Sequence, residues 1–235
     1  MLSVVVPVYN EERALPRFLE RAALWEGCFE LLFSDGGSTD ATLELLAGHK
    51  VVSGAKGRGG QCNRGARAAC GDALLFLHAD ELVDPAVPHL VAEAVGRGAR
   101  WGCLTLRWDL DTPAYRFGAW VSNLRAARGT PFGDQGVFLT RELFEEVGGF
   151  PDLPIMEDYE LSRRLAARGL RPVQLKAEVV ASARRFEEGG PVRTALGMYR
   201  LRRLYRAGAP IEEIEAAYRD VRGGACRDQK ARWRI

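Results

Sequence analysis

The feature that most constrains the fold is a short apolar run, residues 73–77, which ends in His78, Ala79 and Asp80. A continuous apolar run of this length, bounded by turn residues, is typical of a strand buried on both faces. In open α/β sheets, ligands bind just outside the carboxyl ends of such strands. We therefore expect Asp80 to lie at a ligand site, where a carboxylate can bind a divalent cation and the cation can bind phosphate oxygens.

The first 80 residues alternate between short apolar runs and segments with helical spacing. Strands are expected at 2–8, 30–34, 50–53 and 73–77, and helices at 15–23, 41–47 and 61–69. A glycine-rich basic loop, residues 54–60, leads into the last of these helices. This alternation predicts an α/β fold with a mixed, mainly parallel, Rossmann-like sheet flanked by helices.

Beyond residue 85 the pattern is less regular. Residues 101–110 alternate in polarity, as a half-exposed antiparallel strand does. Further strands are expected at 137–139, 171–175 and 179–182, and helices at 85–95, 114–128, 141–147, 156–168, 197–206 and 211–219. The basic end of the chain, residues 223–235, is expected to be a mobile tail.

Charge and cysteine content exclude several classes of protein. The net charge of +2 and the pI of about 8.3 are too mild for a nucleic-acid-binding protein. No apolar run approaches the roughly 20 residues that a membrane-spanning helix needs. The cysteines are odd in number and none has C-x-x-C spacing, a pattern that favours a reduced, cytoplasmic protein. A peripheral contact with the inner face of a membrane stays open.

Six motifs occur in one order along the chain. They are Val-Pro-Val-Tyr-Asn-Glu at 6–11, Asp-Gly-Gly-Ser-Thr-Asp at 35–40, Gly-Arg-Gly-Gly-Gln-Cys-Asn-Arg-Gly-Ala at 57–66, His-Ala-Asp at 78–80, Gly-Asp-Gln-Gly at 133–136 and Glu-Asp-Tyr-Glu-Leu at 157–161. Together they resemble the family 2 glycosyltransferases of GT-A fold, over residues 3 to about 185. The resemblance implies an inverting, metal-dependent enzyme that moves a sugar from a nucleotide-diphosphate sugar, usually a UDP-sugar, to an acceptor hydroxyl.

The resemblance also implies a domain plan. One domain is expected over residues 1–222, with a nucleotide-binding half at 1–100, a catalytic and acceptor half at 101–190 and C-terminal helices at 191–222. The helix at 197–206 carries arginines on one side and apolar residues on the other. Such a helix either rests on an anionic membrane surface or packs on its own domain.

Ten residues are expected to contact the donor nucleotide. They are Pro7, Tyr9, Asn10, Glu11, Asp35, Arg58, Gln61, Asn63, Ala79 and Arg185. An aromatic ring such as Tyr9 can stack on a base, and Arg58 between glycines can bind phosphate. The resemblance assigns nucleoside recognition to Asp35, although Asp-Gly is also a turn signal. Arg185 is expected either in a lid over the diphosphate or in surface ion pairs.

The resemblance assigns the catalytic base to Asp158, next to Glu157. An acceptor hydroxyl must lose a proton as it attacks the anomeric carbon, and a carboxylate can take that proton. Both acids also suit the first turn of a helix, whatever the function. Asp134 is the rival base, and Gln135 is expected to orient acceptor or sugar.

The motif at 78–80 stands where the family has Asp-x-Asp. The metal is therefore expected on Asp80 and His78, with Mn²⁺ or Mg²⁺ as the ion. Manganese accepts imidazole more readily, whereas magnesium needs only one or two carboxylates besides phosphates and water. His78 faces the core or the sugar in the alternative interpretation.

Two other functions are compatible with these residues. A sugar-1-phosphate nucleotidylyltransferase has a similar sheet, but its glycine-rich signature follows the first strand, where this chain has Tyr9, Asn10 and Glu11. A catalytically silent nucleotide-sugar binding module is suggested by His78 in place of the first aspartate.

Overall fold

The computed structural model describes residues 1–221, except for the side chains at 184, 185, 188, 191 and 219–221. The expected tail at 223–235 and the side chain of Arg185 lie outside this description. The described chain forms two compact units, residues 1–182 and the segment that begins at Ala183. Whether function divides at residues 100, 190 and 222 stays a prediction.

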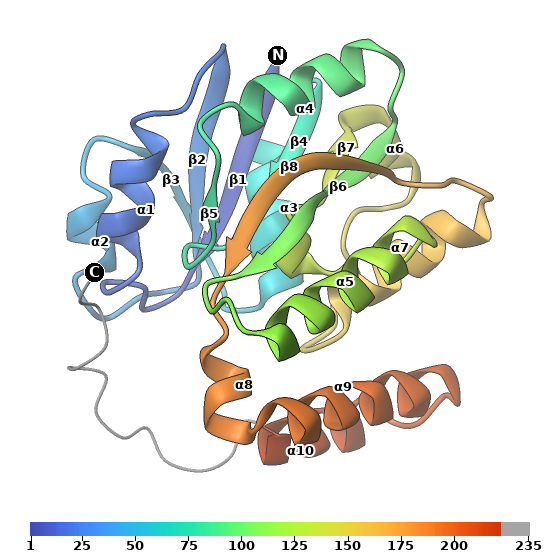
Figure 1. The fold of residues 1–235 in the computed structure, drawn as a ribbon. Coiled ribbons are helices and arrows are strands. Elements are labelled where there is room, and N and C mark those ends of the chain that lie inside the picture. Colours follow the sequence, from blue (N-terminus) through green and yellow to red (C-terminus); the bar gives the residue numbers. More distant parts are fainter. Residues whose placement is uncertain (222–235) are drawn as a thin grey trace. The chain divides into compact units, whose positions relative to one another are not determined.

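The first unit contains a single sheet and its covering helices (Figure 1). Its elements are β1 (Leu2–Val8), α1 (Leu15–Ala22), β2 (Phe29–Asp35), α2 (Thr42–Leu45), β3 (Lys50–Ser53), α3 (Arg58–Ala68), β4 (Ala73–Phe76), β5 (Leu82–Val83), α4 (Val87–Gly96), β6 (Trp101–Trp108), α5 (Pro113–Ala127), the 3-10 helix η1 (Gly133–Gln135), β7 (Phe138–Thr140), α6 (Arg141–Glu146), α7 (Glu157–Ala167) and β8 (Val173–Ala181). The second unit contains α8 (Arg184–Gly189), α9 (Pro191–Arg206) and α10 (Ile211–Val221).

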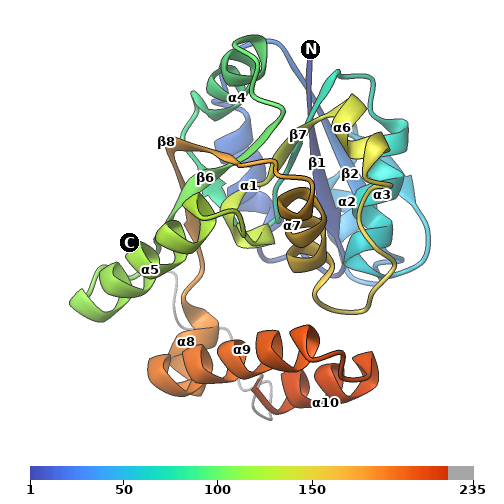
Figure 2. The same ribbon diagram turned by 90° about the vertical axis from the view of Figure 1, so that its right-hand side faces the viewer.

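The sheet has eight strands in the order β3-β2-β1-β4-β7-β6-β8-β5. Strands β1 to β4 are parallel, β7 is antiparallel to both β4 and β6, and β8 is parallel to β6. Figure 2 shows α3 and α4 on opposite sides of β1. The expected fold class, a mixed and mainly parallel sheet with flanking helices, is confirmed.

The central strands are buried because apolar residues fill both of their faces. Every residue of β4 is buried, and β1 is buried except at Pro7. Helix α3 lies so close to β1 that a Cβ at Gly65 would come within 2.3 Å of Val5 Cγ1. Glycine at 65 therefore allows the helix to pack directly on the sheet, which fixes the first turn of α3 at the carboxyl ends of β1 and β2.

Several elements differ from the sequence expectation. Strand β6 was expected to be half-exposed and antiparallel, but it is nearly all buried and, besides its antiparallel pairing with β7, it pairs in parallel with β8; β5 and α8 were not expected. Helix α3 begins at Arg58, so the glycines at 59 and 60 belong to its first turn rather than to a loop. Two strands were expected at 171–175 and 179–182, but the structure has one continuous strand, β8. A β-bulge between Gln174 and Glu178, opposite Cys103 and Thr105, accommodates the polar residues between them. Helix α9 begins at Pro191, a residue whose fixed φ suits a first helical turn.

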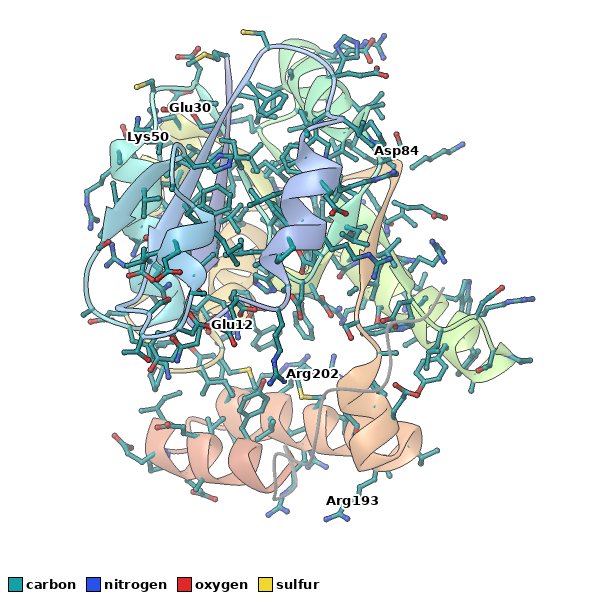
Figure 3. The ribbon with its side chains drawn as sticks, turned by 90° about the vertical axis from the view of Figure 1, so that its left-hand side faces the viewer. Glu12, Glu30, Lys50, Asp84, Arg193 and Arg202 are labelled. Carbon is teal, nitrogen blue, oxygen red and sulfur yellow. The ribbon has the colours of Figure 1, made fainter. Side chains whose placement is uncertain are left out.

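An ion pair between a partly buried acid and an exposed lysine, at the far end of the sheet, gives a pH-dependent contribution to stability. Glu30 accepts hydrogen bonds from Lys50 Nζ (2.6 Å), Ser3 Oγ (2.5 Å) and Cys70 N (2.7 Å), and its side chain is 16% exposed (Figure 3). Burial alone would raise the pKa of Glu30, but these bonds outweigh it and lower the pKa to about 2.

We expect Glu30→Gln to remove an acid-sensitive part of the folding free energy. Because the folded pKa lies below the unfolded value, this part is present above about pH 4.5 and is lost as the pH falls toward 2. Urea unfolding should show the wild type about 2–3 kcal/mol more stable than the variant at pH 6, with the gap closing toward pH 2. A gap that stays constant over this range would contradict the assignment.

Candidate functional site

The loops that follow β1 and β2 are joined to each other by hydrogen bonds. Asn10 N donates to Ser38 Oγ (2.9 Å), and Thr39 N donates to Asn10 Oδ1 (2.9 Å). Glu11 N donates to Thr42 Oγ1 (2.7 Å). Asn10 has a positive φ of 55°, which asparagine accepts more readily than most residues. Asn10 and Glu11 thus fix the loop at the expected nucleotide site, partly through their backbones.

Asp35 ends β2 and is 1% exposed. Its carboxylate accepts from Gly37 N (2.8 Å), from Ser38 N (3.1 Å to Oδ1 and 3.3 Å to Oδ2) and from Ser38 Oγ (2.6 Å), which is the turn chemistry considered as the alternative. These contacts use about all of the lone-pair positions of the carboxylate. The structure therefore shows the turn role of Asp35, while nucleoside recognition stays a prediction.

The Tyr9 ring lies at the same edge, with Lys56 Nζ 3.8 Å from its centroid. This cation–π contact joins the loop after β1 to the loop after β3. Lys56 was not expected in the site, since a lone lysine in a glycine-rich loop has no distinguishing signal. A base stacking on Tyr9 would meet this ammonium group.

The amides of Gln61 and Asn63 are directed at backbone groups, which differs from the expectation that both point at the ligand. Gln61 Nε2 donates to Val8 O and Ser34 O, both at 2.8 Å, and so ties β1 to β2. Asn63 exchanges two 2.8 Å hydrogen bonds with the backbone of Phe150. Both side chains therefore position the loops around the site.

Four segments distant in sequence meet around one small pocket. Arg58 comes from the first turn of α3, His78 follows β4, Gly133 begins η1, and Glu157 and Asp158 begin α7. The remaining lining is Cys62, Phe76, Val137, Phe150 and Leu161. Polar groups on an apolar floor at the ends of parallel strands are the arrangement typical of a ligand site.

Asp158 is oriented by two backbone N–H groups. Its Oδ2 accepts from Gly133 N (2.7 Å) and its Oδ1 from Tyr159 N (2.6 Å). Met156, just before the helix, is left-handed with φ of 70° although it is not glycine, so this backbone conformation is strained. Each carboxylate oxygen keeps a further lone pair for a proton, as a general base requires.

Glu157 is nearly fully buried beside Arg58. The Arg58 Nη1–Glu157 Oε1 distance is 3.3 Å, although the angles do not make it a hydrogen bond. Burial raises the pKa of Glu157, while the Arg58 guanidinium acts in the opposite direction. The half-exposed Arg58 also lines the pocket, and a guanidinium there suits an anion.

His78 is paired with Glu81, a residue that sequence reasoning missed. His78 Nδ1 lies 3.1 Å from Glu81 Oε1, and His78 N donates to Glu81 Oε2 (2.9 Å). Burial alone would lower the pKa of His78, but the Glu81 carboxylate outweighs it and raises the pKa to about 9. The i, i+3 spacing of a histidine and an acid was the only available signal.

The two metal donors expected from the sequence stay predictions. Glu81 lies at His78 Nδ1, so Nε2 of a neutral ring keeps its lone pair, and a carboxylate on the other ring nitrogen is the usual partner of a metal-bound histidine. Asp80 is exposed and fits, and within the described residues no group of three histidine, cysteine, aspartate or glutamate side chains could bind an ion. A single carboxylate suits an ion that also binds a diphosphate and water.

The 3-10 helix η1 packs against β6, and Asp134 is not among the residues that line the pocket. Burial raises the pKa of the Cys103 thiol on β6, the Arg125 guanidinium acts in the opposite direction, and the Asp134 charge adds to the rise. Gln135 is buried, and it accepts from Arg125 Nη2 (3.1 Å) and donates to Asn123 Oδ1 (3.3 Å). Gln135 thus fixes η1 to α5 instead of reaching an acceptor or sugar as expected.

The comparisons with known proteins agree with these features. The sequence model described as Glycosyl transferase family 2 matches residues 3–107. An undecaprenyl-phosphate 4-deoxy-4-formamido-L-arabinose transferase of Aeromonas hydrophila is 35% identical over 112 residues, which is 40% of this chain and 34% of that protein. A PGL/p-HBAD biosynthesis glycosyltransferase of Mycobacterium bovis is 27% identical over 220 residues, 87% of this chain and 84% of that protein.

Solved structures show the same fold. Mannosyltransferase PcManGT from Pyrobaculum calidifontis, in complex with GDP-Man and Mn²⁺, has a TM-score of 0.66 at 19% identity and covers 94% of this chain and 69% of its own. S. aureus TarS 1-349 in complex with UDP-GlcNAc has a TM-score of 0.61 at 19% identity, covering 77% and 58%. The fold is thus GT-A, the fold of these glycosyltransferases.

Proposed function

This chain belongs to glycosyl transferase family 2 and is a glycosyltransferase, and we propose that it transfers a sugar from a UDP-sugar to an acceptor hydroxyl with inversion at the anomeric carbon. The observation that carries the proposal is Asp158, oriented by Gly133 N–H in a pocket that also contains Arg58. This combination supplies a base and an anion-binding group at one place, as a single displacement requires.

The proposed reaction uses the two sides of the pocket differently. Asp158 accepts the proton of the acceptor hydroxyl while that oxygen forms a bond to the anomeric carbon. The bond from this carbon to the diphosphate oxygen breaks on the opposite face, and the electron pair leaves with the nucleoside diphosphate. Arg58, aligned by Glu157, donates hydrogen bonds to the charge that grows on the leaving phosphate.

A divalent cation, Mn²⁺ or Mg²⁺, is part of the proposal. Asp80 would bind it, and when bound it neutralises charge on the diphosphate. His78, whose Nδ1 lies beside Glu81, lines the pocket on the same segment as Asp80. Pro7, Tyr9, Asn10, Glu11, Asp35 and Ala79 are proposed around the nucleotide, partly through their backbones.

The proposed acceptor is a hydroxyl on a lipid. Relatives named for transfer to undecaprenyl phosphate and dolichyl phosphate support this proposal, since they align with 40% and 34% of the chain. Within residues 1–221, the structure contains no helix that is long and apolar enough to cross a bilayer. We propose a peripheral contact with the membrane.

We expect thermal unfolding to reveal the donor and its ion together. At a hundred times its dissociation constant, UDP with Mn²⁺ should stabilise the protein by about 2.7 kcal/mol, a rise in Tm of roughly 5–10 °C. Mn²⁺ alone should give almost no shift, because one carboxylate is a weak site without the diphosphate. Equal shifts with and without the ion would contradict the metal requirement, and the absence of a shift with UDP, GDP or TDP would contradict the donor class.

A further inference from the structure

Helix α9 has an apolar stripe that its own unit leaves uncovered. Val192 is 71% exposed, Leu196 63% and Tyr199 54%, and their i, i+4, i+7 spacing places them on one face. Thr194 and Leu201 are each 1% exposed and lie on the opposite face. Helix α9 packs on α8 and α10 within the second unit. It therefore buries one side and presents a second apolar side to its surroundings.

Arginines lie beside this stripe and, at Arg203, continue its line toward the end of α9. Arg193, Arg200 and Arg203 are exposed, and Figure 3 shows Arg193 pointing away from the helices of this unit. The sequence of α9 also contains Arg202 and Arg206 and has no aspartate or glutamate. An apolar stripe that includes a tyrosine, bordered by cations, is the pattern of a helix that lies in the interface of an anionic bilayer.

We propose that the Val192–Leu196–Tyr199 face of α9 binds an anionic phospholipid surface. The apolar side chains would enter the acyl boundary, and the arginines would contact lipid phosphates. A second copy of the chain is a poorer occupant, because a symmetric contact would set two arginine-rich helices against each other. The inference identifies the surface for the proposed peripheral membrane contact and thus rests on that part of the proposed function.

The test is co-sedimentation of the full chain with vesicles, without donor or acceptor, so that failed glycosyl transfer cannot affect it. We expect binding to vesicles of phosphatidylcholine that contain about 30% phosphatidylglycerol, which gives them a negative surface potential. Binding to vesicles of phosphatidylcholine alone should be much weaker. Arg200→Gln with Arg203→Gln should weaken binding about 30-fold, since each arginine contributes roughly fivefold. Leu196→Gln should weaken it by about tenfold.

Matched controls are available in the first unit. Leu24→Gln removes a leucine that is 59% exposed, and Arg171→Gln with Lys176→Gln removes two exposed positive charges. These variants should bind vesicles within about twofold of the wild type. The proposal is overturned if the protein binds both vesicle types equally, or if the control variants lose as much binding as the α9 variants. It is also overturned if the wild type is a dimer that Leu196→Gln dissociates while vesicle binding stays unchanged. UDP binding, measured separately, tests the transferase assignment.

Discussion

Replacement of Asp158 by asparagine is expected to lower kcat for glycosyl transfer by roughly 10²- to 10⁴-fold, the usual contribution of a positioned base. The amide keeps the size of the carboxylate and can still accept the 2.7 Å hydrogen bond from Gly133 N. It cannot take a proton from the acceptor. Donor binding should therefore stay close to that of the wild type, and the loss should appear in kcat.

Asp134→Asn is the matched control, because Asp134 lies in η1 only one residue after Gly133. We expect this change to alter kcat by only a fewfold, since Asp134 is not among the residues that line the pocket with Asp158. Transfer assays on both variants, with donor affinity measured separately, compare the two candidate bases. If Asp134→Asn were the more damaging change, the base assignment would have to move, and unchanged turnover in both would indicate that neither acid is the base.

Loss of the Arg58 side chain is expected to have the second largest effect. Arg58→Met removes the hydrogen bonds proposed to the diphosphate, which at about 1.5–3 kcal/mol for charged partners corresponds to a loss of roughly 10- to 150-fold in kcat/KM. It also leaves the buried Glu157 carboxylate without its cation, so the protein should lose about 1–3 kcal/mol of stability.

A double variant separates these two consequences. Adding Glu157→Gln to Arg58→Met removes the uncompensated buried charge, and we expect most of the lost stability to return. Activity should not return, because no group remains to contact the diphosphate. Urea unfolding and donor-dependent kinetics on the same preparations measure both effects. Recovery of activity along with stability would show that Arg58 acts only through folding.

The strands around the site could be predicted because their burial is visible in the sequence. Residues 2–8 and 73–77 are apolar runs without interruption, and they form β1 and β4, the centre of the sheet. The carboxyl ends of these strands then place the loop at Tyr9 and the segment at His78 on one edge. Local pattern was sufficient here because both strands are buried on both faces.

The hydrogen-bond partners of the polar side chains could not be predicted in the same way. Gln61 and Gln135 both belong to motifs, yet their amides bind groups 53 and 10 residues away in the chain. Such partners depend on which loops meet in the folded chain, and this cannot be predicted from the spacing of neighbouring residues. The same limit applies to Arg58, whose pairing with Glu157 joins the first turns of α3 and α7.

The sequence shows that His78 replaces the first aspartate of the family's motif, but it does not show what His78 contacts. A histidine in the position of a metal-binding aspartate suggested either a ligand or a core residue. The structure places Glu81, which is 2% exposed, beside its Nδ1. This contact depends on the burial of a neighbouring acid, a property of the folded chain.

The most direct test of the account is a crystal structure of the Asp158→Asn variant with UDP-sugar and Mn²⁺. We expect the diphosphate within hydrogen-bonding distance of the Arg58 guanidinium and the ion on Asp80. The side chain at position 158 should face the anomeric carbon from the side opposite the diphosphate. A nucleotide sugar bound away from Arg58, or with residue 158 and the diphosphate on the same side of the sugar, would contradict the proposed displacement.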